Sequence, residues 1–130
     1  FVPADIASVV SADMFDEFFL EPIKRIAGSF PYSIMHTHSS YLHVLDPLLE
    51  IDEVRAIQVG TDLEGPSIKD LLPQLRGIQE RKPLIVGGQL SARQIHTILT
   101  ELSPQGLCVF AYPHTAEQVR QLLAAVGEME

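Results

Sequence analysis

The sequence has 130 residues, with 9 lysines and arginines against 17 aspartates and glutamates, one cysteine and no tryptophan. The net charge of −8 argues against binding to a phosphate backbone, so we expect no nucleic-acid partner. The longest apolar runs are far shorter than the ~20 residues of a membrane-spanning helix, so we also expect no membrane partner. A single cysteine excludes an internal disulfide framework and is typical of a reducing, cytoplasmic compartment.

The first predicted element is a helix within residues 11–30. Ser11 is a suitable N-terminal cap, and Gly28 is a suitable end. Pro22 lies inside the pattern and predicts a kink or a break, because proline cannot donate the helical hydrogen bond. The apolar positions that recur at helical spacing are Phe15, Phe18, Phe19, Ile23 and Ile26.

Four short apolar runs after this helix predict β-strands, at residues 32–37, 56–60, 84–87 and 107–112. Each is followed by a segment with helical periodicity, so the chain reads as four βα units whose strands begin about 23 to 28 residues apart. Helix starts are expected near Pro66, Ser91 and Thr115.

Short loops and strands that are apolar on both faces predict an α/β fold with a parallel four-stranded sheet. We expect one domain over residues 1–130, forming the carboxyl-terminal half of a (β/α)8 TIM barrel, which needs ~250 residues to close. The alternative is a small doubly wound sheet. Because the sequence begins with Phe1 rather than methionine, we expect a fragment of a longer barrel.

Candidate functional residues follow from the rule that parallel α/β folds carry their sites at the carboxyl ends of the strands. His36 and His38 end the first predicted strand, on the same face. Such a pair serves as metal ligands, as general acid and base, or as hydrogen-bonded structural residues. The candidate catalytic residues are His36, His38, Asp62 and His114, the candidate substrate-binding residues are Gln58, Gln89 and Tyr112, and the candidate metal ligands are His36 and His38.

Three further residues are expected to have structural roles. His43 and His96 lie in predicted helical segments, where a surface or packing role is expected. Cys108 lies early in the last predicted strand, where a lone cysteine is expected to be a small buried apolar residue. The glycine pair at 87–88 lacks the pattern of a nucleotide-binding loop.

Four segments of the chain, in order, resemble the uroporphyrinogen decarboxylase-like superfamily. Residues 15–26 resemble the helix before its fifth strand, and residues 36–51 resemble its strand-then-helix block, which usually begins His-x-Cys-Gly-Asn. Residues 56–59 and 113–119 resemble later segments of the same family pattern, in the same order. The resemblance covers nearly the whole chain, but only the carboxyl-terminal half of the family's barrel.

The resemblance implies a barrel with one of two activities. One branch decarboxylates the acetate side chains of uroporphyrinogen without a cofactor, and the other uses zinc to pass methyl groups between corrinoid proteins and thiols. His36 matches the first zinc ligand of the methyltransferase branch, His38 replaces its cysteine, and Cys108 lies near the place of a third ligand. The decarboxylase branch has its catalytic aspartate and substrate-binding arginines in the half of the barrel that has no counterpart here.

These observations lead to two hypotheses of different classes. The first is a decarboxylase or a zinc-dependent methyltransferase that acts on a small carboxylated or methylated substrate. The second is a non-catalytic binding or assembly module of the same fold. In either case the open edges of a half-barrel predict a homodimer.

Overall fold

The computed structural model describes residues 1–127, in which strands and helices alternate. Residues 128–130, at the end of the domain expected over residues 1–130, lie outside the described part. The strands are β1 (Val2–Pro3), β2 (Ile34–His38), β3 (Ala56–Thr61), β4 (Leu84–Gly88) and β5 (Leu107–Ala111). The helices are α1 (Ala12–Phe18), α2 (Leu20–Ala27), α3 (Leu45–Leu49), α4 (Ile68–Gln79), α5 (Ala92–Glu101) and α6 (Ala116–Gly127). Two 3-10 segments complete the order, η1 (Asp5–Ser8) and η2 (Ser39–Val44).

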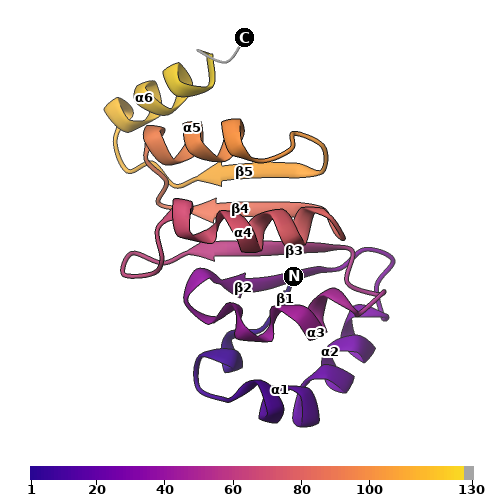
Figure 1. Ribbon diagram of the computed structural model, residues 1–130. Coiled ribbons are helices and arrows are strands. Elements are labelled where there is room, and N and C mark those ends of the chain that lie inside the picture. Colours follow the sequence, from indigo (N-terminus) through magenta and orange to yellow (C-terminus); the bar gives the residue numbers. More distant parts are fainter. Residues whose placement is uncertain (128–130) are drawn as a thin grey trace.

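All strands form one sheet in the order β1-β2-β3-β4-β5, and every neighbouring pair is parallel (Figure 1). The predicted parallel α/β class with βα repeats is therefore confirmed. The four predicted strands are present, and the sheet contains β1 as a fifth. This strand has only two residues, too few to show a periodicity in the sequence, and Pro3 is tolerated there because β1 lies at an edge.

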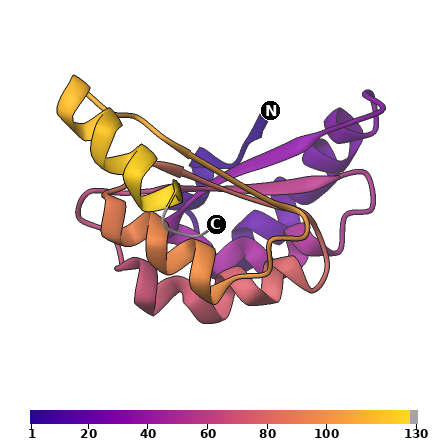
Figure 2. The same cartoon turned by 90° about the horizontal axis from the view of Figure 1, so that it is seen from above.

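Helices α3, α4 and α5 all lie on one face of the sheet (Figure 2). This follows from the strand order, because right-handed crossovers between successive neighbours always return over the same face. A doubly wound sheet needs a reversal in strand order, and this sheet has none, so that alternative is wrong. The core lies between the sheet and these helices, where Met35, Ile57, Leu84, Leu75 and Ile98 are completely buried.

The predicted break in the first helix is present. Helix α1 starts at the cap Ser11, whose side chain accepts from the backbone of Met14, and the chain breaks at Phe19 before α2 begins. Pro22 therefore lies in the first turn of α2, where its missing N–H removes no bond that the helix needs. Gly28 caps the end of α2, as predicted.

The other face of the sheet carries no helix between β2 and β5 (Figure 2). The far end of the Phe110 ring lies against Gly87 on this open face, since a Cβ atom added at Gly87 would be 2.6 Å from the ring. Cys108 lies there too and is exposed, so the expectation of a buried cysteine is wrong. The exposure of Cys108 could not be predicted from the sequence, because the strands have the same apolar pattern whether helices cover one face of the sheet or both.

Helix α6 lies at the β5 end of the sheet and packs mainly against α5 (Figure 1). Much of its apolar stripe is exposed, including Val119, Leu123 and Val126. Among residues 1–127, no helix is both long and apolar enough to cross a membrane.

Candidate metal centre

His36 and His38 lie side by side at the carboxyl end of β2, as their spacing predicts. Their Nε2 atoms are 3.0 Å apart, and their ring centroids are 4.8 Å apart in an edge-to-face arrangement. The close approach needs Gly60, which pairs with His38 across the sheet. A Cβ atom at this glycine would be 3.3 Å from the His36 ring, so a larger residue would displace the imidazoles.

The outer nitrogen of each ring is held by an acceptor. The Nδ1–H group of His38 donates to Asp62 Oδ1 at 2.6 Å, and the Nδ1–H group of His36 donates to Gln58 Oε1 at 2.8 Å. A neutral imidazole that donates from Nδ1 has only a lone pair at Nε2. Both Nε2 lone pairs then converge at 3.0 Å, where they repel each other unless a proton or a metal ion is bound there.

Asp62 is the most heavily bonded side chain of the centre, one residue beyond the end of β3. Its second oxygen, Oδ2, accepts from the Ser40 backbone N–H at 3.0 Å, from Ser40 Oγ at 2.6 Å and from Ser39 Oγ at 3.2 Å. Burial raises the pKa of this carboxyl, but the hydrogen bonds from Ser40 and His38 outweigh burial, and the net pKa is lowered. Asp62 is therefore ionised at neutral pH and fixes His38 as an Nδ1 donor.

Asp5 is the third potential ligand of the centre and was not predicted. One ligand atom each from Asp5, His36 and His38 lie within 4.8 Å of one another, and Asp5 Oδ1 is 3.9 Å from His38 Nε2. Asp5 is two residues beyond the end of β1, so it lies near a strand end by the same rule that selected the histidines. The sequence did not reveal it because the two-residue strand gives no recognisable pattern.

Tyr41 holds Asp5 and His38 together. Its hydroxyl donates to Asp5 Oδ1 at 3.1 Å, and its ring lies 5.2 Å from the His38 ring, centroid to centroid. Burial, together with the bond to Asp5, raises the pKa of the phenol, so the hydroxyl keeps its proton and remains a donor. The side chain reaches this position because the backbone of Tyr41 interrupts the helical turn of η2.

The donor set fits a zinc ion. Two imidazole nitrogens and one carboxylate oxygen are a known three-residue combination for catalytic zinc, and that combination leaves a fourth position for another ligand. The partners at both Nδ1 atoms are those that orient histidine ligands in metal sites. Cys108 is not part of the set, because β5 lies three strands from β2, roughly 14 Å away at the usual strand spacing.

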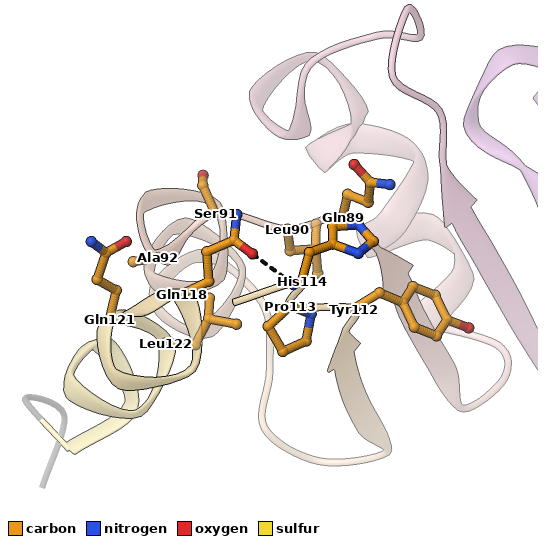
Figure 3. A pocket seen from close by; sticks show the side chains of 10 residues that line it. All are labelled: Gln89, Leu90, Ser91, Ala92, Tyr112, Pro113, His114, Gln118, Gln121 and Leu122. Atoms are coloured by element: carbon orange, nitrogen blue, oxygen red, sulfur yellow. Dashed lines mark hydrogen bonds between the residues drawn. The ribbon is translucent and has the colours of Figure 1, made fainter. Parts of the chain in front are cut away.

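The remaining predicted residues divide between this centre and a separate pocket. Gln58 is buried and its amide oxygen is used by His36, so it supports a ring. Gln89, Tyr112 and His114 line a pocket of about 220 Å³ between the starts of α5 and α6 (Figure 3). The structure therefore does not bring His114 to the other candidate catalytic residues.

Asp62 and Gln89 line a further pocket of about 230 Å³ beyond the carboxyl ends of β3 and β4. Gln89 borders both pockets, so the two hollows adjoin each other at the carboxyl edge of the sheet, from Asp62 to His114. The other two histidines have the expected structural roles: His96 is exposed on α5, and His43 bonds to the Val10 carbonyl oxygen at 3.2 Å.

Comparison of the chain with protein-family models, with curated proteins and with solved structures finds no match.

Proposed function

We propose that this protein is a zinc-dependent enzyme of the uroporphyrinogen decarboxylase-like type that transfers a methyl group between small molecules. The observation that carries the proposal is the convergence of the two Nε2 lone pairs at 3.0 Å while both Nδ1 atoms are bound to acceptors. The resemblance of residues 15–26 and 36–51 to the family supports it. The methyltransferase branch is favoured over the decarboxylase branch, because the centre offers metal ligands and, among residues 1–127, no arginine or lysine is bonded to Asp5, His36, His38 or Asp62.

Within this proposal, His36, His38 and Asp5 hold the zinc ion. Bound zinc supplies Lewis acidity, which lowers the pKa of a coordinated thiol or water. Asp62 and Gln58 keep the two rings oriented, and Tyr41 fixes the carboxylate of Asp5. The substrate enters along the carboxyl edge of the sheet, where Asp62, the partner of His38, also lines a hollow.

Metal content tests the proposal directly. The purified protein, loaded with zinc and dialysed, should retain one zinc ion per chain by elemental analysis, and His36→Ala and His38→Ala should each abolish retention. His43→Ala and His96→Ala remove exposed histidines outside the centre and should retain the metal. Zinc retention that is absent in the unmodified protein, or unchanged in His36→Ala, contradicts the proposal.

The reaction class is tested separately with methylcobalamin and a thiol such as coenzyme M. Transfer moves the methyl group from cobalt to sulfur. The S–C bond forms with loss of the thiol proton, and the Co–C bond breaks with its electron pair left on cobalt, which passes from Co(III) to Co(I). The absorbance of methylcobalamin should therefore fall only in the zinc-loaded protein. Zinc retention without this change points to another reaction at the same centre, and absence of both favours a non-catalytic module.

We propose further that two copies associate through the exposed β5 edge and α6. The support is physical: β5 has no partner on its outer side within residues 1–127, and Leu123 on α6 is 67% exposed. Unpaired strand edges and exposed apolar helix faces favour association. An apolar groove of about 310 Å³ between α5, β5 and α6, lined by residues that include Leu99, Leu107 and Val126, lies at this edge.

A further inference from the structure

The face of the sheet opposite α3, α4 and α5 has the composition of a covered surface. Strands β2 to β5 contain no aspartate, glutamate, lysine or arginine. Ile34 and Ile85 alternate with the buried residues of β2 and β4, so they point to this open face, where the Phe110 ring lies against Gly87. Wholly parallel sheets occur almost only in proteins that cover both faces, so this face fits contact with another protein surface better than contact with water.

The exposed apolar side chains gather at the two opposite ends of the sheet. Of the 13 large apolar residues that are exposed among residues 1–127, eight lie in residues 1–32 and four lie in residues 112–126. Figure 1 shows α1 and α2 at one end of the sheet and α6 at the other. Met14 and Phe18 are exposed on α1, and Leu123 and Val126 are exposed on α6. Each end therefore presents an apolar surface, and the middle of the molecule does not.

Helix α6 lacks the neighbour that the preceding helices have. Helices α3, α4 and α5 each connect two adjacent strands, whereas α6 follows β5, and no strand within residues 1–127 lies beyond β5 in the sheet. The exposed stripe with Leu123 and Val126 and the apolar groove of about 310 Å³ between α5, β5 and α6 lie at this end. A strand and a helix placed beyond β5 would cover both surfaces.

We infer that two copies of the chain associate head to tail twice, so that the β5 and α6 end of each copy meets the β1, α1 and α2 end of the other. The inference rests on the association of two copies proposed above and specifies the surface that the β5 and α6 end contacts. Opposite ends that meet through a twofold rotation close into a ring, and two copies supply eight strands of five or six residues, enough for a closed parallel barrel.

The apolar area at the two ends is sufficient for a stable dimer. At roughly 100 Å² of exposed area each, the twelve residues offer about 1,200 Å² per copy, against the ~800 Å² per partner of a standard interface. Strand pairing contributes less, because β1 has two residues and Pro3 has no backbone N–H to donate. Side-chain contacts therefore supply most of the association.

This arrangement brings Tyr112 of one copy beside the metal centre of the other. His36 and His38 alternate with the buried residues of β2, so the centre lies on the open face. Tyr112 extends the open face of β5, since its ring packs edge-on against Phe110 at 5.3 Å between centroids, and it is 57% exposed. In the ring, β5 of one copy lies next to β1 of the other, which leads to Asp5. The Tyr112 hydroxyl then faces the exposed ligand of the centre, so each centre is completed by the other chain.

Cross-linking between single cysteines tests the arrangement without any metal. In a Cys108→Ser background, ¹⁵N-labelled chains with Leu123→Cys and unlabelled chains with Met14→Cys are mixed and treated with a short bismaleimide. The products should join one labelled chain to one unlabelled chain by mass. Gly77→Cys lies on α4, away from both ends, and should link to neither variant.

Two results would overturn the inference. Linking of Leu123→Cys chains to each other places α6 against α6, which refutes the head-to-tail ring and leaves the proposed association intact. An unmodified protein that is monomeric in sedimentation equilibrium refutes the ring and the association together. Neither result affects zinc retention, so failure here is distinguishable from failure of the proposed metal centre.

A second pair of cysteines tests the shared site. Chains with Asp5→Cys and chains with Tyr112→Cys, mixed in the same background, should also give products that join one chain of each kind. Because each chain carries one cysteine, every such link lies between copies. Linking through Leu123→Cys and Met14→Cys without linking through Asp5→Cys and Tyr112→Cys would refute the placement of Tyr112 at the partner's centre.

Discussion

The substitution Asp62→Asn tests how the centre fixes the proton on His38. The backbone N–H of Ser40 donates to Asp62 Oδ2 and cannot reverse its polarity. An asparagine must therefore place its oxygen toward Ser40 and its NH₂ group toward His38. The His38 ring then accepts at Nδ1 and carries its proton at Nε2, the atom that would bind zinc.

The expected loss of zinc affinity is about 10- to 100-fold, the usual effect of removing the partner of a histidine ligand. That range corresponds to about 1.4 to 2.8 kcal/mol, since each factor of ten is ~1.4 kcal/mol. The Asp62 side chain is only 27% exposed, so water compensates incompletely for the lost carboxylate.

Two measurements check this reasoning. Competition titration with a chromophoric chelator gives the zinc affinity, and long-range ¹H–¹⁵N correlation spectra of the metal-free protein report which His38 nitrogen carries the proton. Asp16→Asn makes the same charge change at an exposed position on α1 and should alter neither. An Asp62→Asn protein that keeps the Nδ1-protonated ring, or binds zinc as tightly as the unmodified protein, refutes the argument.

Three further predictions concern stability and association. Because the folded-state pKa of Asp62 lies below its ordinary value of 3.8, its ionisation stabilises the fold above about that pH, and this stabilisation is lost as the pH falls through the lower folded-state pKa. The difference in urea-unfolding free energy between the unmodified protein and Asp62→Asn should therefore shrink from pH 7 to pH 3. A constant difference would contradict this prediction. Gly88→Ala should destabilise the protein by about 2 kcal/mol or more in the same assay, because Gly88 has φ +145° and an added Cβ atom would lie 2.0 Å from Thr61 Oγ1. The control variant Gly77→Ala has open space around the added Cβ atom on α4 and should stabilise the protein by about 1 kcal/mol. Equal effects of the two substitutions on the unfolding free energy would contradict the backbone argument. Leu123→Asp should convert a dimer to a monomer in sedimentation equilibrium with an unchanged circular dichroism spectrum, whereas a monomeric unmodified protein would disprove the proposed association.

The sequence was sufficient for the βα repeats because each strand is a compact apolar run and each later helix has a clear stripe. The rule that sites lie at strand ends then selected His36, His38 and Asp62, which the structure brings into contact. Asp5 was missed because β1 is too short to show a strand pattern.

His114 was grouped with these residues because it follows a strand end in the same way. His114 lies away from them because β5 and β2 are three strands apart in the sheet, and a sequence does not give strand order directly. The role of Gln58 was also beyond the sequence, since its contact with His36 depends on the register of β3 against β2.

The sequential strand order also affects how the molecule opens. Every strand pairs only with strands that are adjacent to it in the chain, so β5 and α6 are held almost entirely by β4 and α5. A protein built this way loses terminal units without disrupting the rest, as repeat proteins do. Amide hydrogens of β5 should therefore exchange through partial unfolding of the last unit, while those of β2 and β3 should exchange only when the whole molecule unfolds. His36, His38 and Asp62 lie on or directly after β2 and β3, inside the part that opens last, whereas the pocket beside His114 lies on the unit that opens first.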